Sequence, residues 1–273
     1  MKISFITTTY NSLETLKECI KSVSECSIKD MEHIVADDGS TDRTIEYIKN
    51  LNSFNIKLIS CGRVGRANAL NIAIEKAKGD FICILDSDDL VIPDNFGLFI
   101  DFIVRKDMLE NYDVFYGNIV INGINKNSPT KKNHSENQIN YRELNKKTLL
   151  FYNRIPNVCA LIKKKSAHDV GYYNNKRVSQ IDFDLWLRMV INNNKFLKIE
   201  IPIGIKRLHE NQFFERKNHF KYTFSGVSLA INFACTKYNK CLCIASCFVG
   251  GLRLVWSILP RSLRVTLRTY GKL

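Results

Sequence analysis

The first 85 residues alternate four strand-like runs with three helical patterns, and this order constrains the fold more than any other feature of the chain. The strand-like runs are residues 3–7, 33–36, 56–59 and 81–85. Between them, apolar residues recur at three- and four-residue spacing, as on the buried side of a helix. Strands that alternate with helices predict a parallel, doubly wound sheet with right-handed crossovers. We therefore expect an α/β fold in which helices flank a mostly parallel sheet.

The alternation is less regular after residue 89. Pro93 is expected to begin a helix, and residues 113–122 read as a further strand. Residues 125–140 are rich in Asn and Lys and are expected to form a mobile loop. Another helix is expected near Asp182, where an (i, i+4) pair of Asp184 and Arg188 would support it.

The charge divides the chain into two parts. The net charge is +13, but no Asp or Glu follows Glu215, and residues 216–273 hold ten Lys or Arg. Hydrophobic residues make up 45% of the chain, which is enough for a sizeable core. We expect one domain over residues 1–215, with halves at about 1–105 and 106–215, and a basic, helical tail over 216–273.

The tail combines this charge with apolar residues. Residues 241–252 carry no charge, but twelve residues are fewer than the roughly 20 that span a bilayer. Arg261, Arg264 and Arg268 recur at helical spacing among apolar residues, which favours an amphipathic helix lying on an anionic membrane. A helix packed on the domain would look similar. The aromatic and basic residues of 213–222 raise nucleic acid as another partner, but no binding motif accompanies them, so none is expected.

The cysteines favour a cytoplasmic protein. There are nine, an odd number, and Met1 passes directly into a strand-like run without an apolar leader. Both features indicate a reducing compartment. The spacing of Cys241, Cys243 and Cys247 fits no common zinc pattern, so these residues are expected to be small apolar side chains.

Acidic residues follow two of the expected strands. Asp37 and Asp38 come after the second strand, and Asp86, Asp88 and Asp89 after the fourth. Ligands of such sheets bind beyond the carboxyl ends of the strands. Carboxylates at i and i+2 can bind Mg²⁺ or Mn²⁺. Each cluster also has a purely structural alternative, as a helix cap or a solvated turn.

Several segments, taken in order, resemble glycosyltransferase family 2, whose members are inverting enzymes with the Rossmann-like GT-A fold that use nucleotide sugars. The matching segments run from residue 1 to about 212: Phe5–Asn11, Asp37–Asp42, Gly65–Asn71, Ala77–Ile82, Leu85–Asp89, Asp182–Arg188 and Arg207–Gln212. The subgroup that they resemble builds bacterial surface polysaccharide such as O-antigen. Three positions depart from the family pattern: Thr8 replaces a usual Pro, Ile181 replaces a frequent Glu, and Pro156-Asn157 replaces a His-containing stretch.

The resemblance implies a role for individual residues. Asp182 would be the catalytic base, and Asp88 with Asp86 would bind the metal, with Asp89 beside them. His209 is a further possible metal ligand, and Arg207 could reach the metal or the diphosphate. The nucleotide-sugar contacts would be Thr9, Tyr10, Asp37, Asp38, Asn68, Asp86 and Ser87.

The expected activity is metal-assisted, inverting transfer of a hexosyl group from a nucleoside-diphosphate donor to a hydroxyl of a glycan acceptor. By analogy with the family, the acceptor would be linked to a polyprenyl diphosphate at the inner face of the cell membrane. The alternatives are a non-catalytic module that binds nucleotide sugar or membrane, and a nucleotidyltransferase. The latter would need a Gly-rich phosphate loop, which residues 8–11 do not form.

Overall fold

The computed structural model describes residues 1–51, 55–122, 139–207, 219–238 and 240–259. Two compact units make up the chain. The first unit is Met1–Leu144 with Ile155–Leu208, and the second is Asn145–Arg154 with His209–Leu273. The predicted boundary at residue 215 lies outside the described residues and stays a prediction.

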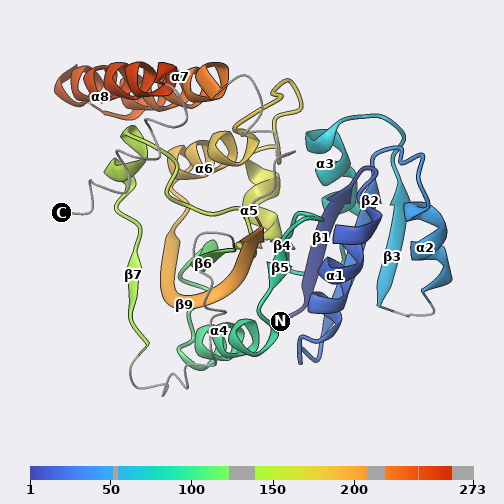
Figure 1. Cartoon of the computed structure of the whole chain (residues 1–273). Coiled ribbons are helices and arrows are strands. Elements are labelled where there is room, and N and C mark those ends of the chain that lie inside the picture. Colours follow the sequence, from blue (N-terminus) through green and yellow to red (C-terminus); the bar gives the residue numbers. More distant parts are fainter. Residues whose placement is uncertain (52–54, 123–138, 208–218, 239, 260–273) are drawn as a thin grey trace. The chain divides into compact units, whose positions relative to one another are not determined.

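The first half of the first unit has the predicted parallel order. Strands β3, β2, β1 and β4 stand next to one another, and every pair among them is parallel. α1 and α2 pack against β2 through Leu16, Ile20, Val35 and Ile48 (Figure 1). The elements are β1 (Ile3–Thr9), α1 (Leu13–Ser24), β2 (Met31–Asp37), α2 (Thr44–Asn50), β3 (Ile56–Ser60), α3 (Arg66–Lys76) and β4 (Phe81–Ile84).

The second half continues the same sheet with mixed directions. Beyond β4 the order is β8, β6, β9 and β5, and β7 also pairs with β9. β8 runs antiparallel to both β4 and β6, whereas β6 and β9 are parallel. The elements are β5 (Leu90–Val91), α4 (Pro93–Arg105), β6 (Val114–Asn122), β7 (Tyr141–Glu143), β8 (Leu161–Lys163), α5 (Lys164–Asp169), α6 (Ile181–Ile191) and β9 (Phe196–Arg207).

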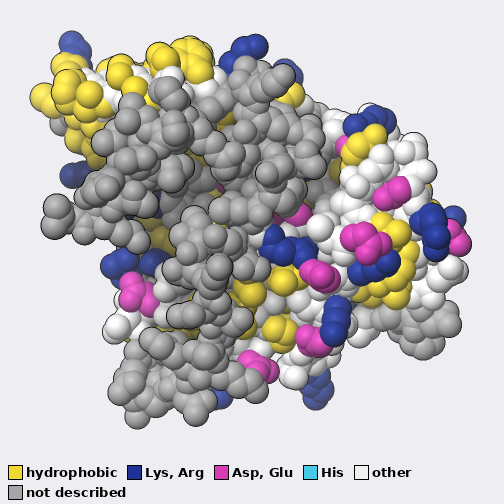
Figure 2. All heavy atoms as spheres, in the orientation of Figure 1, with side chains coloured by type: hydrophobic (Ala, Val, Ile, Leu, Met, Phe, Trp, Pro, Cys, Tyr) yellow, Lys and Arg dark blue, Asp and Glu magenta, His cyan; other side chains and the backbone are white. Residues whose placement is uncertain are grey.

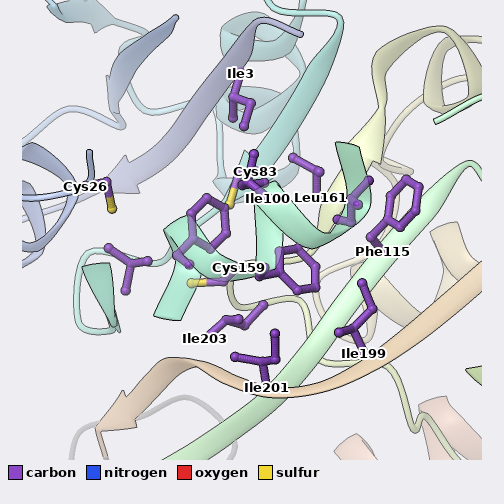
Figure 3. Close-up of a cluster of buried hydrophobic side chains, with 14 of the residues drawn as sticks. Ile3, Cys26, Cys83, Ile100, Phe115, Cys159, Leu161, Ile199, Ile201 and Ile203 are labelled. Atoms are coloured by element: carbon purple, nitrogen blue, oxygen red, sulfur yellow. The ribbon is translucent and has the colours of Figure 1, made fainter. Parts of the chain in front are cut away.

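One buried cluster joins both halves of the sheet. Ile3 and Cys83 from the parallel strands lie in it together with Phe115 of β6 and Ile199 of β9 (Figure 3). Fully burying an aliphatic or aromatic side chain contributes about 1.5–3 kcal/mol. Because the cluster spans strands from both halves, the two halves share one core and are not separate domains.

Gly79 shows why the segment before β4 needs a glycine. A Cβ at this position would lie 2.6 Å from the Ser4 backbone nitrogen of β1. The Gly79 N–H also donates to Ser4 Oγ, at 2.9 Å. Only glycine allows the chain to pass this close to β1.

The second unit contains a short 3₁₀ helix, η2 (Lys146–Leu150), and two long helices, α7 (His219–Lys237) and α8 (Lys240–Ile258). α7 and α8 lie side by side (Figure 1). Ser246 of α8 donates to the Leu150 carbonyl at 2.7 Å. The sulfur atoms of Cys235 in α7 and Cys243 in α8 lie next to each other, a proximity that the sequence analysis did not anticipate.

α8 differs from the expectation for the tail. The helix continues through Arg253 and has 19 residues with a mean hydropathy of 1.8, so by length and composition it could cross a membrane. The core helix of a soluble protein can have the same length and composition, but only 17% of this apolar stretch is buried. Apolar side chains gather over α8 on the surface (Figure 2). Arg261, Arg264 and Arg268, like most of the predicted mobile loop, lie outside the described residues.

Candidate active site

The carboxylates that follow β2 hold their own loop in place. Asp37 is 1% exposed, and its Oδ2 accepts the backbone N–H groups of Gly39 and Ser40, both at 3.0 Å. Asp38 Oδ1 accepts those of Val64 and Gly65, at 2.8 and 2.9 Å. Asp37 Oδ1 is buried without a hydrogen-bond partner among the described residues. Both residues therefore shape the backbone, and their nucleotide contacts stay predictions.

Hydroxyl groups connect the loop after β1 with the loop after β4. Thr9 Oγ1 lies 2.7 Å from Ser12 Oγ, which lies 3.0 Å from Ser87 Oγ. Thr9 is buried, and Ser87 is in the loop that carries the second acidic cluster. Two of the predicted nucleotide-sugar contacts, Thr9 and Ser87, are thus coupled through Ser12.

Tyr10 presents an exposed ring at the end of β1. The ring is part of a side chain that is 42% exposed, and the Arg63 guanidinium lies 3.3 Å from its centroid. Arg63 also donates to the Asp38 carbonyl, at 3.4 Å. A flat ring covered by a guanidinium is a suitable surface for stacking a nucleotide base.

The second acidic cluster brings three carboxylates together. One oxygen from each of Asp86, Asp88 and Asp89 lies within 4.8 Å of the others. Burial, followed by the charges of Asp86 and Asp88, raises the pKa of Asp89 to about 8. Oxygen ligands and crowded negative charge fit a hard divalent cation such as Mg²⁺ or Mn²⁺. The structure thus places Asp89 beside Asp86 and Asp88, as predicted, and metal binding by these residues stays a prediction.

Arg66, at the start of α3, neutralises part of this charge. Its Nη2 lies 2.5 Å from Asp86 Oδ1, and both side chains are partly exposed. Burial works to lower the pKa of Arg66, but the charge and hydrogen bond of Asp86 raise it above its ordinary value, with a smaller contribution from Asp182. The charge of Asp182 therefore acts on the same guanidinium as that of Asp86.

Asp182 lies in the first turn of α6. Gln180, which precedes the helix, has a left-handed backbone with φ of 56° and is buried. Burial is the largest influence on Asp182 and raises the pKa of its carboxyl, while Arg66 and backbone hydrogen bonds oppose it. A half-buried carboxylate with a raised pKa is a stronger base than an exposed one.

The other predicted residues are engaged within the chain or cannot be placed. Asn68 donates to the Val64 carbonyl and accepts from Asn175, at 2.8 and 3.0 Å. The predicted pair of Asp184 and Arg188 is confirmed, at 2.7 Å. His209 lies outside the described residues, so its metal role stays untested.

Arg207, for which contact with the metal or the diphosphate stays a prediction, has several partners within the chain. Its guanidinium pairs with Glu18 and donates to the carbonyls of Asp88 and Thr15. Its backbone N–H donates to Asp89 Oδ1 at 3.0 Å. Arg207 therefore ties the end of β9 to α1 and to the backbone of the acidic loop.

Sequence reasoning missed Arg66 and Tyr173. Tyr173 is 1% exposed, its hydroxyl donates to Asn157 Oδ1 at 3.0 Å, and the charges of Arg66, Asp182 and Asp86 all act on it. Asn71 of α3 fixes the Tyr173 backbone through two hydrogen bonds, at 2.8 and 3.0 Å. Asn71 lies in a motif that the sequence analysis quoted, but nothing local indicates its partner 102 residues away.

Comparison with known proteins identifies the family. The profile of glycosyl transferase family 2 matches residues 4–171. The *Escherichia coli* protein named UDP-Glc:alpha-D-GlcNAc-diphosphoundecaprenol beta-1,3-glucosyltransferase WfaP is 23% identical over 92% of this chain and 94% of its own. Chondroitin synthase of *Pasteurella multocida* is 26% identical over 80% of this chain, which spans only 22% of that relative.

A solved structure supports the same fold. *S. aureus* TarS 1–349 in complex with UDP-GlcNAc superimposes with a TM-score of 0.66 and 18% identity, over 90% of this chain and 70% of that one. At this identity the likeness concerns the fold alone. Together with the mixed sheet described above, it confirms the predicted GT-A architecture.

Proposed function

Because the chain belongs to glycosyl transferase family 2 and is a transferase, we propose that it moves a sugar from a UDP-linked donor to a hydroxyl of a lipid-linked glycan, with inversion at the anomeric carbon. The name of WfaP, which states a UDP-Glc donor and a diphosphoundecaprenol-linked acceptor, supports this choice of substrates. The product would contribute to a surface polysaccharide. The observation that carries the proposal is that Asp86 pairs with Arg66 and that the charge of Asp182 acts on the same guanidinium, which supports a site shared by a cation-binding cluster and a base.

Asp182 would perform the proton transfer. The oxygen of the acceptor hydroxyl attacks the anomeric carbon from the face opposite the diphosphate, the bond from that carbon to the diphosphate oxygen breaks, and the hydroxyl proton passes to Asp182. The raised pKa of this carboxyl favours accepting that proton. It lies in the first turn of α6, whose neighbouring side chains are buried and anchor the helix.

Asp86, Asp88 and Asp89 would hold Mg²⁺ or Mn²⁺. When bound, the cation supplies positive charge that stabilises the departing nucleoside diphosphate. Hydrogen bonds among the hydroxyls of Thr9, Ser12 and Ser87 connect the acidic loop to the loop after β1. Tyr10 and Arg63 offer a stacking surface for the base.

Replacing Asp182 by Asn tests the reaction. This variant keeps the shape of the side chain but cannot accept the proton, so we expect transfer to fall by at least about 10³-fold. Thermal stabilisation by UDP-sugar with Mn²⁺ should remain near the parental value. Asp169→Asn, which removes an exposed acid at the end of α5, is the matched control. Transfer by Asp182→Asn at the parental rate would show that Asp182 is not the base.

We also propose that the second unit binds the cytoplasmic face of an anionic membrane. Large apolar side chains of α8 recur on one side of the helix and are exposed: Ile244, Phe248, Leu252, Val255 and Ile258. The charge of the region complements anionic lipid, since residues 216–273 contain ten Lys or Arg and no acid. This association would bring the enzyme to the membrane that holds a lipid-linked acceptor.

Vesicle flotation tests the membrane proposal. The full chain should float with vesicles of phosphatidylcholine and phosphatidylglycerol, and less with phosphatidylcholine alone. Phe248→Ser should reduce flotation several-fold, because it removes one large apolar side chain. Val178→Ser is the control, since Val178 is 90% exposed but belongs to the first unit. Equal flotation of both variants would contradict the role of α8.

A further inference from the structure

Arg66 is held differently from two other arginines of the first unit. Arg188 pairs with Asp184 and also donates to the carbonyls of Val170 and Tyr172. Arg207 is likewise tied to two carbonyls and an acid. Among the described residues, Arg66 has one hydrogen-bond partner for its guanidinium, the carboxylate of Asp86.

The Arg66–Asp86 pair is also more accessible than the Arg188–Asp184 pair. The side chain of Arg66 is 40% exposed and that of Asp86 is 31% exposed, against 29% and 10% for Arg188 and Asp184. Solvent screens an ion pair that is partly exposed, so the pair contributes little to stability and a stronger competitor can replace it. Arg66 can therefore change its partner easily, whereas the three hydrogen-bond partners of Arg188 hold its guanidinium in one position.

Asp86 offers its single negative charge to two possible cationic partners, which therefore compete for it. Its Oδ1 accepts the Arg66 bond, and an oxygen of the same carboxylate belongs to the cluster with Asp88 and Asp89. A divalent cation at this cluster carries twice the charge of the guanidinium. A cation that binds there would weaken the hold of Asp86 on Arg66 and leave the guanidinium available for another anion near the cluster.

We propose that Arg66 binds the diphosphate of the donor. Before the donor binds, Arg66 pairs with Asp86, and it leaves this pair when a divalent cation binds the Asp86 carboxylate. This proposal rests on the proposed function for the identity of the donor. The guanidinium fork matches the oxygens of a phosphate group, so the released side chain gains a charged hydrogen bond with the donor. Cation binding and donor binding are thereby coupled. The cation separates Arg66 from Asp86, and the interaction of Arg66 with the donor phosphate then replaces the lost ion pair.

Binding of Mn²⁺ alone, followed by the electron paramagnetic resonance of the free ion, tests the competition. Arg66→Gln should bind Mn²⁺ about two- to fivefold more tightly than the wild type, because the competing cation is gone. Arg66→Lys keeps the charge and should stay near the wild type. Arg43→Gln, which removes an equal charge from an exposed site just before α2, controls for net charge. Unchanged or weaker Mn²⁺ binding by Arg66→Gln would overturn the proposal.

UDP binding at saturating Mn²⁺ tests the second step. Arg66→Gln should lose about tenfold or more in UDP affinity, and Arg66→Lys should lose part of that, because it lacks the fork. Unchanged UDP affinity in Arg66→Gln would refute the phosphate contact.

A double variant tests whether the effect on Mn²⁺ depends on Asp86. In an Asp86→Asn background, Arg66→Gln should no longer change Mn²⁺ affinity. The Mn²⁺ titration needs neither donor nor transfer, so it decides the competition even if the proposed reaction were wrong.

Discussion

The loops after β2 and β4 both carry adjacent aspartates at the same edge of the sheet, but their carboxylates have different surroundings. After β2, Asp37 and Asp38 together accept four backbone N–H groups. After β4, three carboxylates crowd within 4.8 Å, and a partly exposed arginine pairs with one of them. Similar sequences therefore have different surroundings: the carboxylates of the first loop accept backbone N–H groups of that region, whereas those of the second loop lie close to one another, as our proposal of a cation site requires.

The largest expected effect concerns the second loop. Asp88→Asn should lower transfer by about three orders of magnitude, since a bound cation contributes several kcal/mol to stabilising the leaving group. The same variant should lose stabilisation by Mn²⁺ in a thermal-shift measurement. Asp101→Asn, an exposed acid on α4, should change neither quantity. If Asp88→Asn kept its Mn²⁺ response, the division between the two loops would be wrong.

A smaller effect is expected for the first loop, and on stability. Asp37→Ala leaves the partly buried N–H groups of Gly39 and Ser40 without their acceptor and should lower the free energy of unfolding by about 2 kcal/mol. Asp37→Asn retains an oxygen that can accept both bonds, so most of that loss should be absent. Urea unfolding of the two variants measures the difference. Equal losses would indicate that the negative charge of Asp37, and not its hydrogen bonds, stabilises the loop.

The smallest effect comes from the core beneath the first loop. His33 of β2 is buried, its Nε2 lies 2.9 Å from Thr7 Oγ1, and burial lowers its pKa from 6.5 to about 4. Between these values the unfolded chain binds the proton and the folded chain does not, so stability falls as the pH drops below 6.5. From pH 7.5 to 5.5 the loss from His33 should be about 1.4 kcal/mol.

His33→Gln isolates this contribution. The free energy of unfolding of the variant and of the wild type should differ by a pH-dependent amount over this range. Any contribution from Asp89, whose raised pKa acts in the opposite direction, cancels in the difference. Parallel pH profiles would show that His33 does not titrate as its burial implies.

The parallel half of the sheet was predictable because its signals are local. β1 to β4 and the helices between them follow apolar periodicities in contiguous residues, and the structure confirms their order. β8 has only three residues and β9 contains Pro202, so neither gives a clear strand pattern. Their pairing with β4 and β6 depends on contacts between distant segments.

The candidate site divides in the same way. The acids were visible in the sequence because each follows an apolar strand or begins a helix. The roles of Arg66 and Arg207 were not, because an arginine's partner depends on which segments the fold brings near it. The nucleotide-sugar contacts and the catalytic role of Asp182 remain predictions for the experiments above.

The sequence by itself determined the order of the strands and helices and the edge of the sheet at which acidic side chains collect, since both follow from short-range periodicity. Only the tertiary structure decided which of those carboxylates accept backbone N–H groups and which face one another. The physical reason is that the state of a charge depends on the dielectric surroundings and partners that folding supplies, and residues far apart in the chain provide both.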